Sequence, residues 1–249
     1  MIRLKNQREI ELMRRAGKIA AAARALAGEM VAPGVTTREI DKEVHKFILS
    51  QGAIPTFLGY SGYPASVCIS VNETVIHGIP GPRVIREGDI VSIDVGATKD
   101  GYVGDCAATF VAGTCDEDSK KLIEVTRQSF FEGIKFARPG YRVSDISHAV
   151  QTYAEENGFS VVREFVGHGV GREMHEGPEV PNYGKPGHGP RLTAGMTIAV
   201  EPMINAGVAG VKILDDGWTV VTRDGKRSAH YENTILITNG DPVILTTEE

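Results

Sequence analysis

The chain has 249 residues, of which 41% are hydrophobic and 24% charged, and its net charge is −5. This composition is ordinary for a globular protein that buries its core as one domain, and the negative charge argues against DNA and anionic membranes as partners. Three cysteines without a CxxC pair indicate a reducing compartment. Because there is no apolar run of 18 residues, and residues 1–24 lack the apolar core of a signal peptide, we expect a cytoplasmic protein.

Two helices are predicted in the first 52 residues. A capping box formed by Asn6 and Glu9 begins an Ala-rich amphipathic helix. A second box, formed by Thr36 and Glu39, begins another helix, which stops near Gly52.

The first 24 residues carry a net charge of +5, unlike the chain as a whole. The simpler interpretation is a solvated helix face, and the alternative is a weak, salt-sensitive contact with ribosomal RNA. The charged residues are Arg3, Lys5, Arg8, Arg14, Arg15, Lys18 and Arg24 against Glu9 and Glu11.

Residues 91–111 have the pattern of a β-hairpin, with apolar residues at alternate positions and turn residues at 98–101. If the turn is centred on Lys99-Asp100, Asp94 lies directly opposite Asp105 on the same face, with Cβ atoms about 5 Å apart. Two bare carboxylates at that separation repel by roughly 3 kcal/mol at an effective dielectric constant of 20. A divalent metal between them is the simplest explanation, although a single aspartate, taken alone, is more often a turn residue or an exposed strand residue than a ligand.

The second half of the chain repeats the helical pattern of the first at an offset of 106 residues. A helix from about Asp118 is followed by Pro139-Gly140, which corresponds to Pro33-Gly34. The next helix, with Ser144 as its predicted N-cap, ends at Gly158.

The repeat includes the acidic strands. The segment GDIVSID, which ends at Asp94, aligns with GMTIAVE, which ends at Glu201, at an offset of 107 residues. The following strand carries Asp105 in the first half and Glu232 in the second, where the connection is 20 residues longer and contains Trp218. Two halves related by a pseudo-twofold axis would therefore bring four carboxylates to one centre.

We expect one α+β domain over residues 1–249, made of half-repeats of about 6–112 and 113–240. A curved, mostly antiparallel sheet would be covered on one side by two helix pairs, with the site on the other side.

Four histidines lie in segments that contain Gly or Pro close by. His168 lies between two glycines, where the backbone can approach a bound group closely, and four acids with one imidazole suit two divalent ions joined by bridging carboxylates. Without those acids, such a histidine is more often structural. His77 and His175 each precede the acidic strand of their half and can flank a substrate, whereas His188, in PGHGP, fits an exposed turn.

These segments together resemble methionine aminopeptidases of the compact bacterial type I. The resemblance covers residues 6–237 and is carried by HGIP, SIDVGATKDGYVGDCAATF, VGHGVGREMHEGP, GMTIAVEPM and HYENTILIT. The ligand order Asp, Asp, His, Glu, Glu is shared with prolidase, aminopeptidase P and creatinase relatives, which have the pita-bread fold. This sequence lacks the extra N-terminal domain of those relatives, and it lacks the helical insertion and zinc-binding extension of other methionine aminopeptidases.

The resemblance implies a role for each motif residue. Two divalent metals, drawn from Co, Mn, Fe or Zn, would be bound by Asp94, Asp105, His168, Glu201 and Glu232, with Asp105 and Glu232 bridging. His77 and His175 would contact the substrate amide and its oxyanion. The methionine side chain would be held by Phe57, Tyr60, Tyr63, Cys68, Met174 and Trp218, where Met174 replaces the aromatic residue common in the family. Asn72, Thr74 and Ser228 match positions where the family can bind a monovalent cation through carbonyl oxygens.

The implied activity is removal of the initiator methionine from nascent polypeptides, with a preference for a small second residue, by a monomeric enzyme. A metal-bound hydroxide would attack the first peptide carbonyl, while Glu201 serves as general base and acid and His175 stabilises the oxyanion. The alternatives are an X-Pro peptidase and an inactive relative that only binds peptide termini. The latter is disfavoured because all five ligands are present.

Overall fold

The computed structural model describes residues 2–248. Its helices are α1 (Gln7–Glu29), α2 (Thr37–Ser50), the short 3-10 helix η1 (Tyr60–Gly62), α3 (Glu117–Ile134) and α4 (Val143–Glu156). Its strands are β1 (Ile54–Pro55), β2 (Cys68–Val71), β3 (Thr74–Ile76), β4 (Ile90–Lys99), β5 (Tyr102–Val111), β6 (Ser160–Val161), β7 (Gly167–Gly169), β8 (Glu176–Val180), β9 (Thr197–Val200), β10 (Met203–Asn205), β11 (Val211–Ile213), β12 (Val220–Thr222), β13 (Ser228–His230), β14 (Glu232–Leu236) and β15 (Val243–Ile244). Within residues 2–248, no helix has the length and apolar character that crossing a membrane requires.

The first two helices begin as predicted. In both capping boxes the side chain of the N-cap residue, Asn6 or Thr36, accepts from the backbone N–H of the glutamate three residues later. The prediction for α4 was wrong by two residues, because Arg142, not Ser144, is its N-cap. The Asp145 carboxylate accepts from the Arg142 backbone N–H at 2.7 Å, which caps the helix without a serine. The Ser144 hydroxyl instead donates to the carbonyl of His188, which lies exposed in its loop as predicted.

The β4–β5 hairpin forms, but its register differs from the prediction by two residues. Its two-residue loop is Asp100-Gly101, and both residues have positive φ, 50° and 78°, as a type I′ turn requires. A turn centred on Lys99-Asp100 would force that conformation on a lysine. Asp94 therefore lies opposite Ala107 and Asp105 opposite Gly96. Because side chains alternate with a period of two, a two-residue shift leaves both aspartates on one face as diagonal neighbours.

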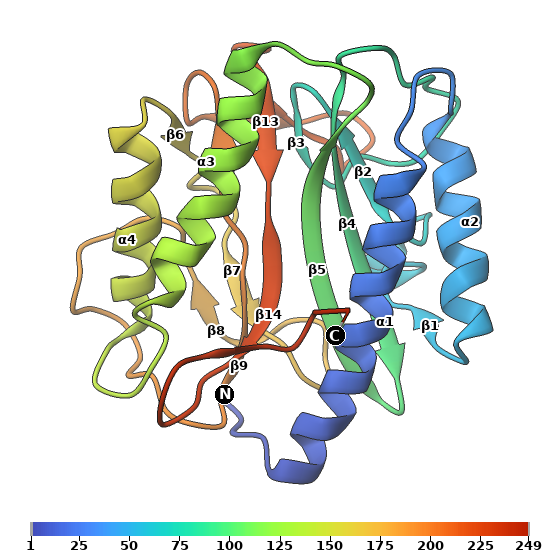
Figure 1. Cartoon of the computed structure of the whole chain (residues 1–249). Helices are drawn as coiled ribbons and strands as arrows, with labels where there is room; N and C mark the ends of the chain where they lie inside the picture. The colour runs from blue at the N-terminus through green and yellow to red at the C-terminus, as the bar shows by residue number, and fades with distance from the viewer. Residues whose placement is uncertain (1, 249) are drawn as a thin grey trace.

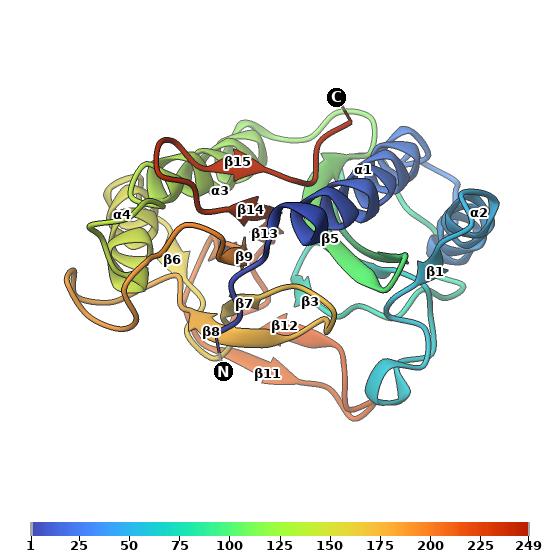
Figure 2. The ribbon, with the colours of Figure 1, turned by 90° about the horizontal axis from the view of Figure 1, so that it is seen from below.

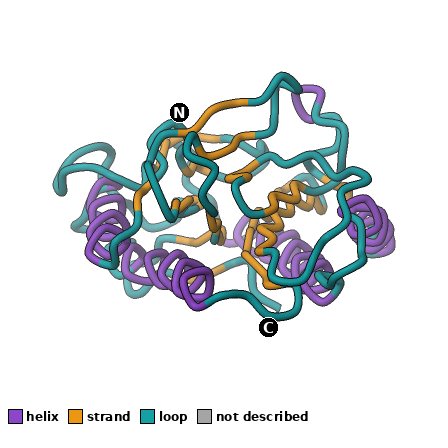
Figure 3. Tube along the Cα trace, turned by 90° about the horizontal axis from the view of Figure 1, so that it is seen from above, coloured by secondary structure: helices purple, strands orange, loops and turns teal. Residues whose placement is uncertain are grey.

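The main sheet has nine strands in the order β1-β4-β5-β14-β9-β7-β8, with β2 added beside β4 and β15 beside β14, and its pairs are antiparallel. In Figure 1 the long strands β4, β5 and β14 run between the α1–α2 pair and the α3–α4 pair. Figures 2 and 3 show the four helices along one side, and Figure 2 shows β11 and β12 on the opposite side. The predicted α+β class, with helix pairs on one side of an antiparallel sheet, is confirmed. We propose that residues 6–112 and 113–240 are two copies of one helix-pair-and-strand unit.

The core consists of apolar clusters between the helices and the sheet. Alanines of α1 and aliphatic residues of α2 pack on β2 and β4, and α4 packs on β8, β9 and β14. Helix α1 lies very close to β5, because a Cβ at Gly104 would be 2.5 Å from the Cα of Gly17. This close approach positions the strand that carries Asp105.

The basic N-terminal segment is not uniformly solvated. Lys5 is 8% exposed, and its Nζ lies 2.5 Å from Oε2 of Glu176, the residue after His175. Arg24 also faces inward, where it donates to the backbone carbonyl of Glu232 at 3.2 Å. These two positive side chains therefore have partners inside the fold, while Arg14 and Arg15 form surface ion pairs with Glu11.

Replacing Gly104 with alanine should destabilise the protein by about 1–3 kcal/mol or more, because the added methyl group meets helix backbone that cannot turn aside. Urea unfolding followed by circular dichroism measures the change. The matched control is Gly240→Ala, where the nearest atom to the new Cβ would be 3.8 Å away. Equal stability of the two variants would contradict the close packing of α1 on β5.

Candidate metal centre

The residues predicted to form the site all line one cavity of about 160 Å³. The five predicted ligands are brought together from five strands or their ends: Asp94 of β4, Asp105 of β5, His168 of β7, Glu201 directly after β9, and Glu232 of β14. The same cavity is lined by His77, His175, Phe57, Tyr60, Tyr63, Cys68, Met174 and Trp218. Trp218 comes from the connection between β11 and β12, so the cavity lies on the side of the sheet away from the helices, as expected.

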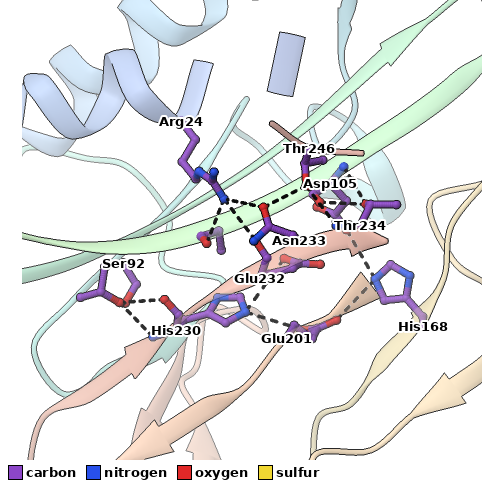
Figure 4. A network of polar contacts seen from close by, with 12 residues as sticks. Arg24, Ser92, Asp105, His168, Glu201, His230, Glu232, Asn233, Thr234 and Thr246 are labelled. Carbon is purple, nitrogen blue, oxygen red and sulfur yellow. Dashed lines mark hydrogen bonds and ion pairs between the residues drawn. The ribbon is translucent and has the colours of Figure 1, made fainter. Parts of the chain in front are cut away.

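His168 presents an unprotonated nitrogen to two acids. Its Nδ1 lies 2.9 Å from the Gly169 carbonyl, which can only accept, so Nδ1 carries the proton. Its Nε2 lies 3.5 Å from Oδ2 of Asp105 and 3.5 Å from Oε1 of Glu201 (Figure 4). Burial lowers the pKa of His168 to about 4, so the ring is neutral near pH 7. A lone pair therefore faces two carboxylates.

Several carboxylate oxygens of the cluster have no hydrogen-bond donor to stabilise a negative charge. Oδ1 of Asp94, Oδ1 of Asp105 and Oε1 of Glu232 are buried without a hydrogen-bond partner in the part of the chain that the structure describes. Burial raises the pKa of Asp105 to about 7. Burial, followed by the charge of nearby carboxylates, raises the pKa values of Asp94, Glu201 and Glu232 well above the usual range. Without a cation, the cluster holds protons that carboxyl groups normally lose.

These residues fit a divalent metal. Ligand atoms of Asp105, His168 and Glu232 all lie within 4.8 Å of one another, and all three residues are buried. An imidazole nitrogen with a free lone pair, together with buried carboxylate oxygens, is a donor set that transition metals accept. Bound cations would also remove the unfavourable burial of negative charge.

The two predicted catalytic histidines lie at the edge of this cluster. His175 is exposed, its ring centroid is 4.2 Å from that of His168, and the Tyr60 hydroxyl lies 2.7 Å from its Nδ1. His77 has a positive φ of 58° and packs edge-on against Phe165 and Trp218. Burial lowers the pKa of His77 to about 4, and partial desolvation of the His175 ring by the cavity wall lowers its pKa as well, so both are neutral near pH 7.

The remaining predicted residues form an apolar wall. Met174 and Cys68 are buried, at 7% and 5% exposed, and pack in one cluster with Phe57 and Tyr63. The Tyr63 ring meets Trp218 edge-on at 5.1 Å, and its hydroxyl is occupied by backbone carbonyls. Burial raises the pKa of Cys68, so this wall has no ionised group.

Sequence reasoning missed His230, which closes β13 and is 2% exposed. Its Nε2 lies 3.8 Å from Oε2 of Glu201 and 4.0 Å from Oε2 of Glu232. The sequence did contain one signal for His230, its position two residues before Glu232. In an extended segment, side chains two residues apart point to the same face. The apolar residues Ile76, Phe165 and Val166 of the cavity were also not predicted.

Polar contacts beside the acids tie β5 to β14 (Figure 4). The Thr234 hydroxyl donates to the backbone carbonyl of Asp105 at 2.9 Å and accepts from its N–H at 3.3 Å. Arg24 of α1 donates to the Asn233 side chain, which also accepts from Thr246.

The predicted monovalent-cation residues lie away from this cluster. The Asn72 carbonyl already accepts from the Ser228 backbone N–H at 2.9 Å, and the Thr222 N–H is bonded to Glu73 beside them. The role of Asn72, Thr74 and Ser228 stays a prediction.

We expect the stability of the metal-free protein to fall as pH rises from about 7 to about 8. Above about pH 7 unfolded histidines are mostly neutral, as the folded ones with lowered pKa already are, so they contribute less than the carboxyl groups. Unfolded carboxyl groups are ionised there, whereas the folded chain retains protons on Asp105 and its neighbours. The folded state therefore binds more protons, and stability falls by up to roughly 1.4 kcal/mol per pH unit for each retained proton.

Urea unfolding of chelated protein at several pH values measures this slope. Saturation with Mn²⁺ is the control, because the carboxylates then stay ionised in the folded state and the slope should largely disappear. A metal-free protein that gains stability over this range would contradict the raised pKa values.

Comparisons with known proteins agree with this geometry. The sequence profile of metallopeptidase family M24 matches residues 11–239. The chain is 56% identical to a methionine aminopeptidase of Clostridium perfringens over 246 residues, which is 99% of each chain. It superposes on the crystal structure of a Thermotoga maritima methionine aminopeptidase with a TM-score of 0.98 and 48% identity, over 100% of both chains. A Pyrococcus furiosus prolidase shares 25% identity, with a TM-score of 0.78 over 99% of this chain and 66% of the prolidase. The chain therefore belongs to metallopeptidase family M24.

Proposed function

We propose that the chain is a metal-dependent aminopeptidase that removes the initiator methionine from nascent polypeptides and prefers a small second residue. The observation that carries the proposal is the position of the acid–imidazole cluster at one side of a small cavity whose other wall is apolar. Full-length similarity to methionine aminopeptidases supports the same function.

Two divalent ions, drawn from Co, Mn, Fe or Zn, would be held by Asp94, Asp105, His168, Glu201 and Glu232. When bound, such ions polarise a carbonyl group and lower the pKa of a coordinated water. The carboxylates are suited to this because their buried oxygens lack other partners.

The chain's own side chains would handle the protons. Oε1 and Oε2 of Glu201 face different groups, His168 and His230, so one oxygen can ligate while the carboxylate takes and returns a proton. The Tyr60 hydroxyl lies 2.7 Å from Nδ1 of His175, and we propose that it donates to this nitrogen, which would leave the imidazole proton on Nε2. That N–H would donate to the oxyanion that forms on the first peptide carbonyl.

The apolar wall would select the substrate side chain. The cavity of about 160 Å³ is lined on this side by Phe57, Tyr63 and Trp218, and we expect it to admit one substrate side chain. Met174 and Cys68 place sulfur atoms in that wall, and soft, polarizable contacts favour a thioether. The substrate's free α-amine would lie toward the acids, which restricts cleavage to chain termini.

The partner would be a newly made polypeptide that begins with methionine. The transient contact with the ribosome stays a prediction. Lys5 and Arg24 face inward, and Arg14 and Arg15 already pair with Glu11.

A Met-Ala-Ser peptide tests the function. Chelation should abolish release of methionine, and adding back a divalent ion should restore it. Glu201→Gln should lower kcat at least about 10²-fold, which is the usual scale for an acid–base group, while circular dichroism shows an intact fold.

Parallel assays of Met-Ala and Ala-Pro peptides separate this proposal from the X-Pro alternative. Preferential cleavage of Ala-Pro would replace it. A metal-loaded protein that cleaves neither peptide would identify a binding protein.

Tyr60→Phe should lower kcat about fivefold, because loss of one hydrogen bond worth about 1 kcal/mol releases the His175 ring to its other tautomer. KM should change less, since the aromatic ring remains in the pocket. The control is the same substitution in a His175→Ala background, where it should have no further effect on kcat. Additive losses in the double variant would show that Tyr60 acts independently of His175.

A further inference from the structure

His230 is a buried imidazole whose backbone is fixed on two sides. Its backbone N–H donates to the Thr109 hydroxyl at 2.9 Å. The same hydroxyl donates to the backbone carbonyl of His230, also at 2.9 Å. On the other side, β13 pairs His230 with Met203 of β10. The ring has therefore little freedom to move away from the acids that it faces.

The ring nitrogen that points at the acids has no partner. Among the described residues, Nε2 of His230 makes no hydrogen bond, although it is buried and lies 3.8 Å from Oε2 of Glu201 (Figure 4). A buried polar atom without a partner costs about 1–3 kcal/mol. An unprotonated Nε2 would add a lone pair directed at carboxylates, so the imidazole proton belongs on this atom.

Glu201 lies between two imidazoles that offer opposite chemistry. Its Oε1 faces Nε2 of His168, which carries a lone pair because Nδ1 donates to Gly169. Its Oε2 faces His230, which can offer an N–H. The two oxygens are thereby distinguished: one is directed to the ligand cluster and the other to a hydrogen-bond donor.

We propose that His230 is a positioning residue for Glu201, and that its Nε2–H donates to Oε2 so that Oε1 is kept for the metal. The inference rests on the proposed metal-dependent function. The contact reaches hydrogen-bond length if Glu201 moves by less than about 1 Å. Such partners of ligating carboxylates commonly change metal affinity 10–100-fold.

Titration of metal-free protein with Mn²⁺, followed by the electron paramagnetic resonance signal of the free ion, tests the proposal without using turnover. His230→Met removes the donor but keeps an apolar side chain of similar length, and it should weaken binding at least about 10-fold. His230→Gln places an amide N–H near the position of the imidazole Nε2–H, and it should bind within about threefold of the original protein. If His230→Met does not fold by circular dichroism, His230→Asn, whose amide is too short to reach Glu201, takes its place.

The outcomes separate three cases. Equal affinity of all variants, or equal weakening by the Gln and Met variants as expected for a direct ligand, would overturn the positioning role. In a Glu201→Gln background the Met substitution should have little further effect, and a full additional loss would also overturn it. Absence of Mn²⁺ binding to the unsubstituted protein would instead refute the proposed function itself.

Discussion

The structure depends on an electrostatic conflict that the fold itself creates. Four carboxylates and the lone pair of His168 face one another in a buried region, where their mutual repulsion is poorly screened. Protons can relieve this conflict, as the raised pKa values indicate, and divalent cations can relieve it better. The cluster therefore has its highest energy when it is empty and ionised, and this is the physical basis for inferring a metal centre.

The rest of the chain holds the acids in place against this repulsion. Helix α1 packs on β5 through the contact between Gly17 and Gly104. Its Arg24 side chain donates to the backbone carbonyl of Glu232 in β14. Thr234 ties the backbone of Asp105 to the neighbouring strand. The contacts of α1 lie on the helix side of the sheet, so part of this support comes from the face opposite the cavity.

The cavity combines two environments that a peptide terminus would need together. On one side are ionisable groups able to bind cations and move protons, and on the other is an apolar wall without ionised groups. Between them lie His77 and His175, both neutral, and the Tyr60 hydroxyl is within hydrogen-bond distance of His175. Membership of family M24 agrees with a cavity that has a metal-binding side and an apolar side, while the roles of single residues are inferred from their geometry.

By itself, the sequence determined the features that depend on neighbours along the chain. Spacing along the chain is enough to recognise the capping boxes at Asn6 and Thr36 and the β4–β5 hairpin. The internal repeat is enough to relate the acid at Asp94 to the acid at Glu201. The tertiary structure alone decided which groups meet from distant segments. It pairs Lys5 with Glu176 and directs His230 at Glu201. The physical reason is that partner choice across a fold depends on packing and backbone geometry in three dimensions, which periodicity along one strand or helix does not encode.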